Sequence, residues 1–105
     1  MELEIQKLRN LCKDETIQMT SHVIDRCKQR DITYIDIKHC VMTGQIIERY
    51  PDDYPYPSCL LLGVSVNNKY LHIVVSVNAG LLWIITAYYP DTDKWESDLK
   101  TRKGR

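Results

Sequence analysis

The chain has 105 residues with 14 basic and 14 acidic side chains, so its formal net charge is zero. A chain of this length folds around a single core, and we expect one domain over residues 1–105. The balanced charge gives no global sign of a nucleic-acid partner, but the end of the chain differs. From Lys94 to Arg105, five basic residues stand against two acidic ones, a local charge of +3 that attracts phosphate. Residues from about 94 therefore form a short basic tail, either a binding segment or a solvated chain end, and we expect Trp95 to anchor it to the domain.

The four cysteines contain no C-x-x-C pair, the spacing most typical of zinc sites. We therefore expect free thiols, no metal site and no cofactor. No apolar run approaches the roughly 20 residues needed to cross a bilayer, and no signal peptide opens the chain. These features predict a cytoplasmic protein that does not act at a membrane.

Three helices are expected in the first half of the chain. Residues 3–12 carry apolar side chains at helical spacing. A second helix begins at Thr20, whose hydroxyl can cap the first free amides, and runs to about Arg30. The third opens with a capping box in residues 33–36 and ends at Gly44, where we expect the left-handed conformation common at helix ends.

The second half of the chain has the composition and period of strands. We expect strands at 45–50, 59–66, 70–78 and 81–89, separated by the proline-containing loop 52–57 and by turns at Asn67-Asn68 and Ala79-Gly80. This order predicts an α+β fold with the N-terminal helices packed on one face of a four-stranded antiparallel sheet.

Turn length sets which residues lie beside His72 in that sheet. If both hairpins have two-residue loops, Gly63 and Ala87 lie opposite His72. Small neighbours on both sides would leave the imidazole in an open groove. The same register would put Leu71 and Ile73 on the core face.

One predicted helix carries three groups suited to phosphate chemistry. His22, Arg26 and Arg30 recur at steps of four, and this spacing keeps them on one stripe of the helix. Imidazole and guanidinium groups suit proton transfer beside a phosphate. The alternative is a solvated stripe that forms structural ion pairs. We predict that His22, Arg26 and His72 approach one another across the junction of helix and sheet.

A ribonuclease that uses no metal needs a base for the 2′-hydroxyl, a cation for the phosphorane and an acid for the leaving oxygen. His22, Glu48 or His72 can act as the base, and His72 or Tyr88 as the acid. The candidate catalytic residues are therefore His22, Arg26, Glu48, His72 and Tyr88, and the candidate RNA-binding residues are Arg30, Lys100, Arg102 and Lys103.

Four motifs together resemble a family of small bacterial proteins. They are Thr20-x-His22-x-x-x-Arg26-x-x-x-Arg30-x-Ile32, Gly44-x-Ile46-Ile47-Glu48-x-Tyr50-Pro51, Leu71-His72-Ile73-Val74 and Thr86-Ala87-Tyr88-x-Pro90. The family is described as a domain of unknown function and resembles RelE/BrnT-like toxin ribonucleases. The match extends from about Ile17 to Arg102.

The resemblance implies a metal-independent endoribonuclease, or mRNA interferase, that is the toxin of a type II toxin-antitoxin system. Its implied partners are RNA, either free mRNA or mRNA on the ribosome, and an antitoxin of the zinc-ribbon, helix-turn-helix kind. The chain departs from RelE-like proteins in its very short tail, so the last acid or cation would be Tyr88, Lys100 or Arg102. The alternative is a non-catalytic RNA- or protein-binding module of the same fold.

Overall fold

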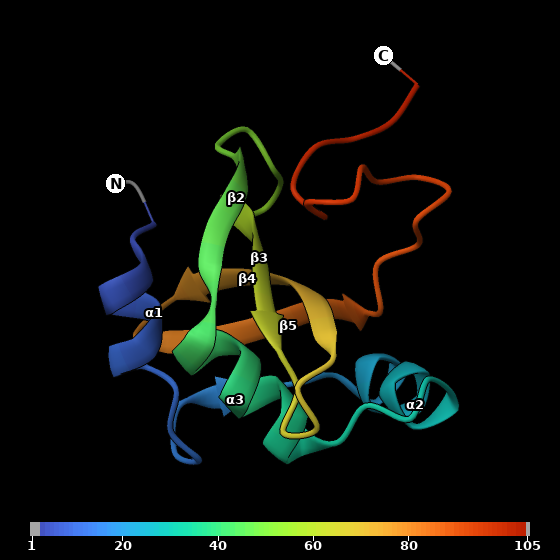
Figure 1. The fold of residues 1–105 in the computed structure, drawn as a ribbon. Coiled ribbons are helices and arrows are strands. Elements are labelled where there is room, and N and C mark those ends of the chain that lie inside the picture. The colour runs from blue at the N-terminus through green and yellow to red at the C-terminus, as the bar shows by residue number, and fades with distance from the viewer. Residues whose placement is uncertain (1–2, 105) are drawn as a thin grey trace.

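The computed structural model describes residues 3–104, which form three helices and a five-stranded sheet (Figure 1). The elements in chain order are α1 (Ile5–Asn10), β1 (Ile17–Gln18), α2 (Ser21–Gln29), α3 (Tyr34–Thr43), β2 (Gln45–Tyr50), β3 (Ser58–Val64), β4 (Tyr70–Asn78) and β5 (Leu81–Tyr88). The expected α+β class is confirmed.

The sheet is mixed and has the strand order β1-β5-β4-β3-β2. Strands β2 to β5 form the expected antiparallel meander, but β1 adds a fifth strand parallel to β5. The prediction of four antiparallel strands was wrong because β1 has only two residues, too few to show a period. Its pairing depends on a partner distant in sequence: the Leu82 amide donates to the Thr16 carbonyl at 2.9 Å.

Local capping explains where α2 and α3 begin. The Thr20 hydroxyl accepts a hydrogen bond from the Val23 amide, and the predicted capping box of Thr33 and Asp36 is present in both directions. Gly44 ends α3 but is extended (φ −85°, ψ 169°), so the expected left-handed conformation is wrong. Glycine is needed there for space, because a Cβ would lie 2.6 Å from the Cys40 carbonyl oxygen.

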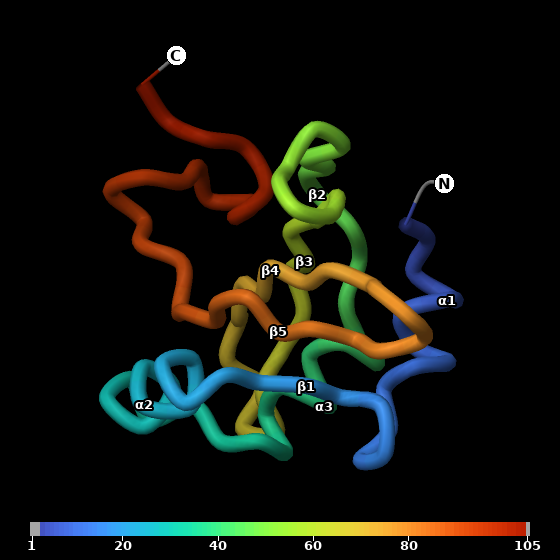
Figure 2. Tube along the Cα trace, turned by 180° about the vertical axis from the view of Figure 1, so that it is seen from behind, coloured from blue at the N-terminus to red at the C-terminus, as the bar shows by residue number. Residues whose placement is uncertain are grey.

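The hydrophobic core lies between the helices and one face of the sheet. Residues such as Val23 and Cys27 of α2, Ile37 of α3, and Ile73 and Val75 of β4 belong to one buried cluster. Figures 1 and 2 show α2 and α3 at one end of the molecule, while the C-terminal tail rises at the other. We call the sheet face turned away from this core the outer face.

The register differs from the expected one by one residue on both sides of His72. The residues opposite His72 are Leu62 on β3 and Tyr88 on β5, not Gly63 and Ala87. The β3–β4 connection spans residues 65–69, because Val64 pairs with Tyr70. The β4–β5 turn has the expected two residues, but a bulge between Val74 and Val75 shifts the pairing beyond it.

Two bulges place side chains on the outer face that simple alternation would put in the core. In β2 the pairing shifts between Ile46, which packs against the core, and Glu48, which lies opposite Leu60. In β5 the irregularity falls between Ile84, which is buried in the core, and the segment that ends at Tyr88. A bulge adds one residue and reverses the face of the later residues in its strand. Glu48 and Tyr88 therefore share the outer face with His72.

Within residues 3–104, no helix has the length and apolar character needed to cross a membrane.

Candidate functional site

The C-terminal tail folds back on itself and covers part of the outer face. Backbone hydrogen bonds join Glu96 to Thr101 (2.8 Å) and Lys103 to Lys94 (2.9 Å), so the tail forms a closed loop. Trp95 is only 3% exposed, which confirms that this side chain pins the tail to the domain. The tail is therefore an ordered part of the fold and can carry functional groups.

Asp98 fixes the tip of this loop. Its carboxylate accepts hydrogen bonds from the amides of Lys100 and Thr101 and from the Thr101 hydroxyl, at 2.9 to 3.0 Å. These amides hold the pKa of Asp98 below its usual value. Leu99 has a left-handed backbone (φ 59°), a conformation that residues other than glycine rarely adopt. The loop thereby directs the Leu99 carbonyl at His72.

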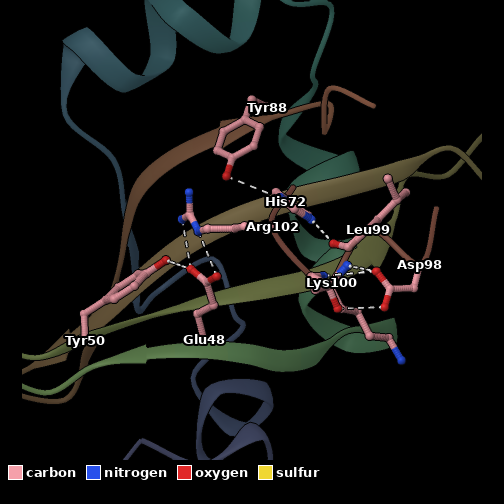
Figure 3. Close-up of polar contacts among 9 residues, drawn as sticks. Glu48, Tyr50, His72, Tyr88, Asp98, Leu99, Lys100 and Arg102 are labelled. Carbon is pink, nitrogen blue, oxygen red and sulfur yellow. Dashed lines mark hydrogen bonds and ion pairs between the residues drawn. The ribbon is translucent and has the colours of Figure 1, made fainter. Parts of the chain in front are cut away.

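His72 is completely buried under the tail (Figure 3). Its Nε2 lies 2.8 Å from the Leu99 carbonyl oxygen, and its Nδ1 lies 3.3 Å from the Tyr88 hydroxyl. A carbonyl only accepts, so Nε2 carries the proton and Nδ1 accepts from Tyr88. The ring also packs edge-on against Trp95, with 4.6 Å between ring centroids. Both ring nitrogens are therefore engaged within the protein.

Burial lowers the pKa of His72, with the Leu99 carbonyl and Glu48 acting in the opposite direction. Burial disfavours the charged imidazolium, so the ring is neutral at pH 7. The predicted open groove over His72 is absent, because Leu62 and Tyr88 stand on either side of it and the tail lies above.

Glu48 and Arg102 form the second part of the site. The guanidinium donates from Nε and Nη2 to the two carboxylate oxygens at 2.9 Å each, a bidentate pair. The Tyr50 hydroxyl donates to the same carboxylate at 2.5 Å. The bond from Arg102 lowers the pKa of Glu48, and burial raises that of Tyr50 to about 12. The carboxylate is thus ionised at neutral pH, and it stays partly accessible with 23% of its side chain exposed.

Arg102 also stacks on Trp95, its guanidinium carbon 4.6 Å from the ring centroid. The third guanidinium nitrogen points away from Glu48 in Figure 3, toward the side where Tyr88 lies. The Arg102 side chain is 45% exposed, so this nitrogen can meet a ligand without breaking the pair with Glu48. Burial raises the pKa of Tyr88, so its phenol remains protonated at neutral pH.

The helical stripe does not join this site. His22 and Arg26 are exposed on α2, which packs on the core through Val23 and Cys27. Neither side chain has a hydrogen bond or ion pair within residues 3–104, and the hydrogen-bond partners of His72 are Tyr88 and Leu99 instead. Arg30 lies further along, where it donates to the Ala87 carbonyl at 2.8 Å and ties α2 to β5.

Of the tail cations that were expected to bind RNA, Lys100 and Lys103 are exposed. Arg102 is exposed as well, but it is paired with Glu48. The structure therefore brings together Glu48, His72, Tyr88 and Arg102 from four separate segments of the chain (Figure 3). Within the described residues, no group of three or more His, Cys, Asp or Glu side chains is placed to hold a metal ion.

Three participants in the site were not predicted as such. Tyr50 had a detectable signal, since it stands two residues after Glu48 on a strand and so shares its face. Trp95 was expected only to anchor the tail, and the Leu99 carbonyl had no sequence signal. Their contacts with His72 depend on how the tail folds back.

The cluster combines three groups on one surface. They are the ionised carboxylate of Glu48, the protonated phenol of Tyr88 and the Arg102 guanidinium, which uses two of its three nitrogens to bind Glu48. These are the groups needed for acid–base chemistry at an anionic substrate. Comparison with curated proteins and with solved structures found no match for this chain. One family model does match, over residues 19–89, and contains Glu48, His72 and Tyr88 but not the tail. The chain belongs to the family described as Domain of unknown function (DUF4258).

Proposed function

We propose that this protein is an endoribonuclease of the toxin type, with Glu48, Tyr88 and Arg102 as its catalytic residues. The observation that carries the proposal is the convergence of these groups on the outer face. Neutral His72 lies on the same face beneath the tail, where two hydrogen bonds fix its ring. Two bulges and a folded tail are needed to build this cluster, and no core packing requires a carboxylate there.

The proposed reaction is transesterification at an RNA phosphate. The Glu48 carboxylate takes the proton of a 2′-hydroxyl, and the 2′-oxygen forms a new bond to phosphorus. The bond from phosphorus to the 5′-oxygen breaks as the Tyr88 hydroxyl turns away from His72 Nδ1 and gives that oxygen its proton. The products are a 2′,3′-cyclic phosphate and a 5′-hydroxyl, and the proton on Glu48 returns to Tyr88 through solvent.

Arg102 supplies the charge stabilisation in this scheme. Its nitrogen facing away from Glu48 contacts a non-bridging phosphate oxygen, while the bidentate pair fixes the plane of the guanidinium. A preorganised cation at a developing charge is often the largest single catalytic contribution. Exposed Lys100 and Lys103 extend the positive surface along which the RNA backbone lies.

His72 is a positioning residue in this proposal and not an acid or base. Both of its nitrogens are occupied, and its side chain is shielded from substrate. By accepting from Tyr88 and donating to Leu99, it holds the acid and the tail in one arrangement. His22, Arg26 and Arg30 have no catalytic role in the proposal.

The test is cleavage of single-stranded RNA by purified protein, with the termini of the products identified. Glu48→Gln and Tyr88→Phe should each reduce the rate roughly 100-fold or more, because each removes one proton-transfer group. Both changes preserve side-chain shape. A substrate with a 2′-deoxy sugar at the cleaved position should be inert.

His22→Ala and Arg26→Ala are the matched controls, since both residues are exposed on α2. Their cleavage rates should equal that of the wild type. A wild-type protein without cleavage activity, or a Tyr88→Phe protein with unchanged activity, would contradict the proposal.

The toxin role is tested by expression in bacteria. We expect the wild-type chain to arrest growth and Tyr88→Phe to relieve the arrest at an equal protein level. We further propose that an antitoxin, of the zinc-ribbon, helix-turn-helix kind, neutralises the protein by covering the outer face and the tail. Harmless expression at a high level of folded wild type would reject the toxin role.

One observation favours a second function, a non-catalytic RNA-binding module. Glu48 and Arg102 form hydrogen bonds with each other, and both ring nitrogens of His72 have hydrogen-bond partners within the protein. Such a module would bind RNA with the same salt dependence but leave it intact. Binding without any 2′,3′-cyclic product would select this function over the nuclease.

A further inference from the structure

A hollow of about 310 Å³ opens on the outer face beside the catalytic cluster. Its walls combine the loop between β2 and β3 with β3, β4 and β5, and they include Asp53, Tyr54, Tyr56, Ser58, Ser76 and Trp83. Both views show this loop rising at the same end of the molecule as the C-terminal tail (Figures 1 and 2).

The aromatic side chains at this hollow are unusually exposed. Tyr54 is 95% exposed and Tyr56 is 44% exposed. Trp83 is half-buried and lies opposite Ser76 in the sheet. Aromatic rings left open around a hollow are the typical platform for an unpaired nucleobase, because every base has a flat face that can stack.

The hollow lies next to the residues of the catalytic cluster along strands β2 and β3. Ser58 lies opposite Tyr50, whose hydroxyl donates to Glu48, and Ser58 is two residues from Leu60, which lies opposite Glu48 itself. Two residues along a strand span about 7 Å. A base in the hollow therefore belongs to a nucleotide next to the phosphate held at Arg102.

Three polar side chains of the hollow, those of Ser58, Ser76 and Asp53, act as acceptors, whereas the Asn78 amide and the Trp83 indole can donate. The Ser58 hydroxyl donates to the Asp53 carboxylate at 2.5 Å, and the Ser76 hydroxyl donates to the Pro57 carbonyl at 2.6 Å. Both hydroxyl protons are thus used, which leaves oxygen lone pairs to face a ligand. The Asp53 carboxylate can only accept. Such a rim suits a base that presents several N–H donors on one edge and has ring or carbonyl acceptors elsewhere.

We propose that this hollow is a subsite for an unpaired guanine of the RNA strand. Guanine presents N1–H and N2–H₂ side by side, whereas uracil has one N–H between two carbonyl groups. The guanine ring stacks on the aromatic side chains, and its donor edge meets Asp53. This inference rests on the proposed function, which supplies RNA as the ligand.

The test measures binding separately from cleavage. The probes are fluorescent 2′-fluoro oligonucleotides of eight uridines in which one central position is guanine, uracil or abasic. They lack the attacking hydroxyl, so the wild type cannot cleave them. Fluorescence anisotropy should show the guanine probe binding at least about five-fold more tightly than the abasic probe, the smallest effect expected for one stacked base.

The Tyr54→Ala/Tyr56→Ala variant should lose this advantage. Tyr34→Ala is the matched control, since Tyr34 is 41% exposed but lies on α3 away from the hollow. Asp53→Asn should bind the guanine and uracil probes with nearly equal affinity, because its amide replaces one acceptor with a donor. The three substituted tyrosines lie outside the buried core, so these variants should melt within a few degrees of the wild type.

The outcomes separate this inference from the proposed function. Equal wild-type affinity for the guanine and abasic probes would overturn the subsite, even if the protein cleaves RNA. A wild-type preference for guanine that Tyr34→Ala retains and the double tyrosine variant loses would support it. That support would stand if no cleavage is found, in which case only the nuclease proposal fails.

Discussion

Replacing His72 with alanine should destabilise the domain substantially, because the ring is a buried link between sheet and tail. The side chain has no exposed surface and donates to Leu99 at 2.8 Å. Loss of that hydrogen bond costs about 1 kcal/mol. The space left beside Trp95 adds about 2 kcal/mol, toward the low end of large-to-alanine changes in cores. The expected total is about 3 kcal/mol.

The prediction can be measured by thermal unfolding and by proteolysis. With an unfolding entropy of about 2.1 cal/mol/K per residue, a loss of 3 kcal/mol over 105 residues lowers Tm by about 14 °C. Trypsin should also cut more quickly after Lys100 and Arg102, because the tail loses its anchor. The same substitution at His22, which is exposed, should change stability by no more than about 0.5 kcal/mol.

A loss below about 1 kcal/mol for His72→Ala, with unchanged trypsin sensitivity, would refute the reasoning that His72 holds the tail. The magnitude also limits how this variant can be used. Reduced activity of His72→Ala would reflect a displaced tail as well as any lost chemistry. Tyr88→Phe, which removes only one hydroxyl, is therefore the better test of catalysis.

Three further predictions concern pH, packing and charge. Because burial lowers the pKa of His72, its contribution to stability should be complete above about pH 6.5 and should decrease as pH falls through the lowered pKa; denaturant unfolding at pH 5 and 7 should show a smaller difference in His72→Gln. Gly63→Ala should cost about 1–3 kcal/mol in the same assay, since its Cβ would lie 2.3 Å from the Cys40 carbonyl oxygen, and wild-type stability would contradict this packing. Lys100→Gln should flatten the dependence of single-stranded RNA affinity on salt by about 0.7 units of log–log slope, and an unchanged slope would exclude a phosphate contact.

Local sequence signals were sufficient for most of the secondary structure. The cap at Thr20, the capping box of Thr33 and Asp36, and the two-residue turn at Ala79-Gly80 are interactions between residues close in sequence. Such contacts leave short patterns that can be recognised without knowing the fold. Strand β2 was predicted with its observed bounds for the same reason.

The candidate residues themselves were also available from the sequence, because only a few side chains in the chain can transfer a proton or hold a phosphate. Glu48, His72, Tyr88 and Arg102 were all among them. Their grouping was not: the helical stripe of His22 and Arg26 was expected beside His72, whereas the contacts of His72 are with Tyr88, Trp95 and Leu99. Spacing on one helix indicates a shared face but not the element that this face meets.

Tertiary structure decided how the candidate residues are grouped, through strand bulges and a folded tail that cannot be recognised from single residues. The bulges in β2 and β5 turn Glu48 and Tyr88 to the outer face, and their positions depend on pairing with neighbouring strands. A shift of one residue reverses the face of every later side chain in the strand, so a small error in register changes the whole site. The tail then closes over His72 through contacts 27 residues apart, which turns an expected surface histidine into a buried, neutral one.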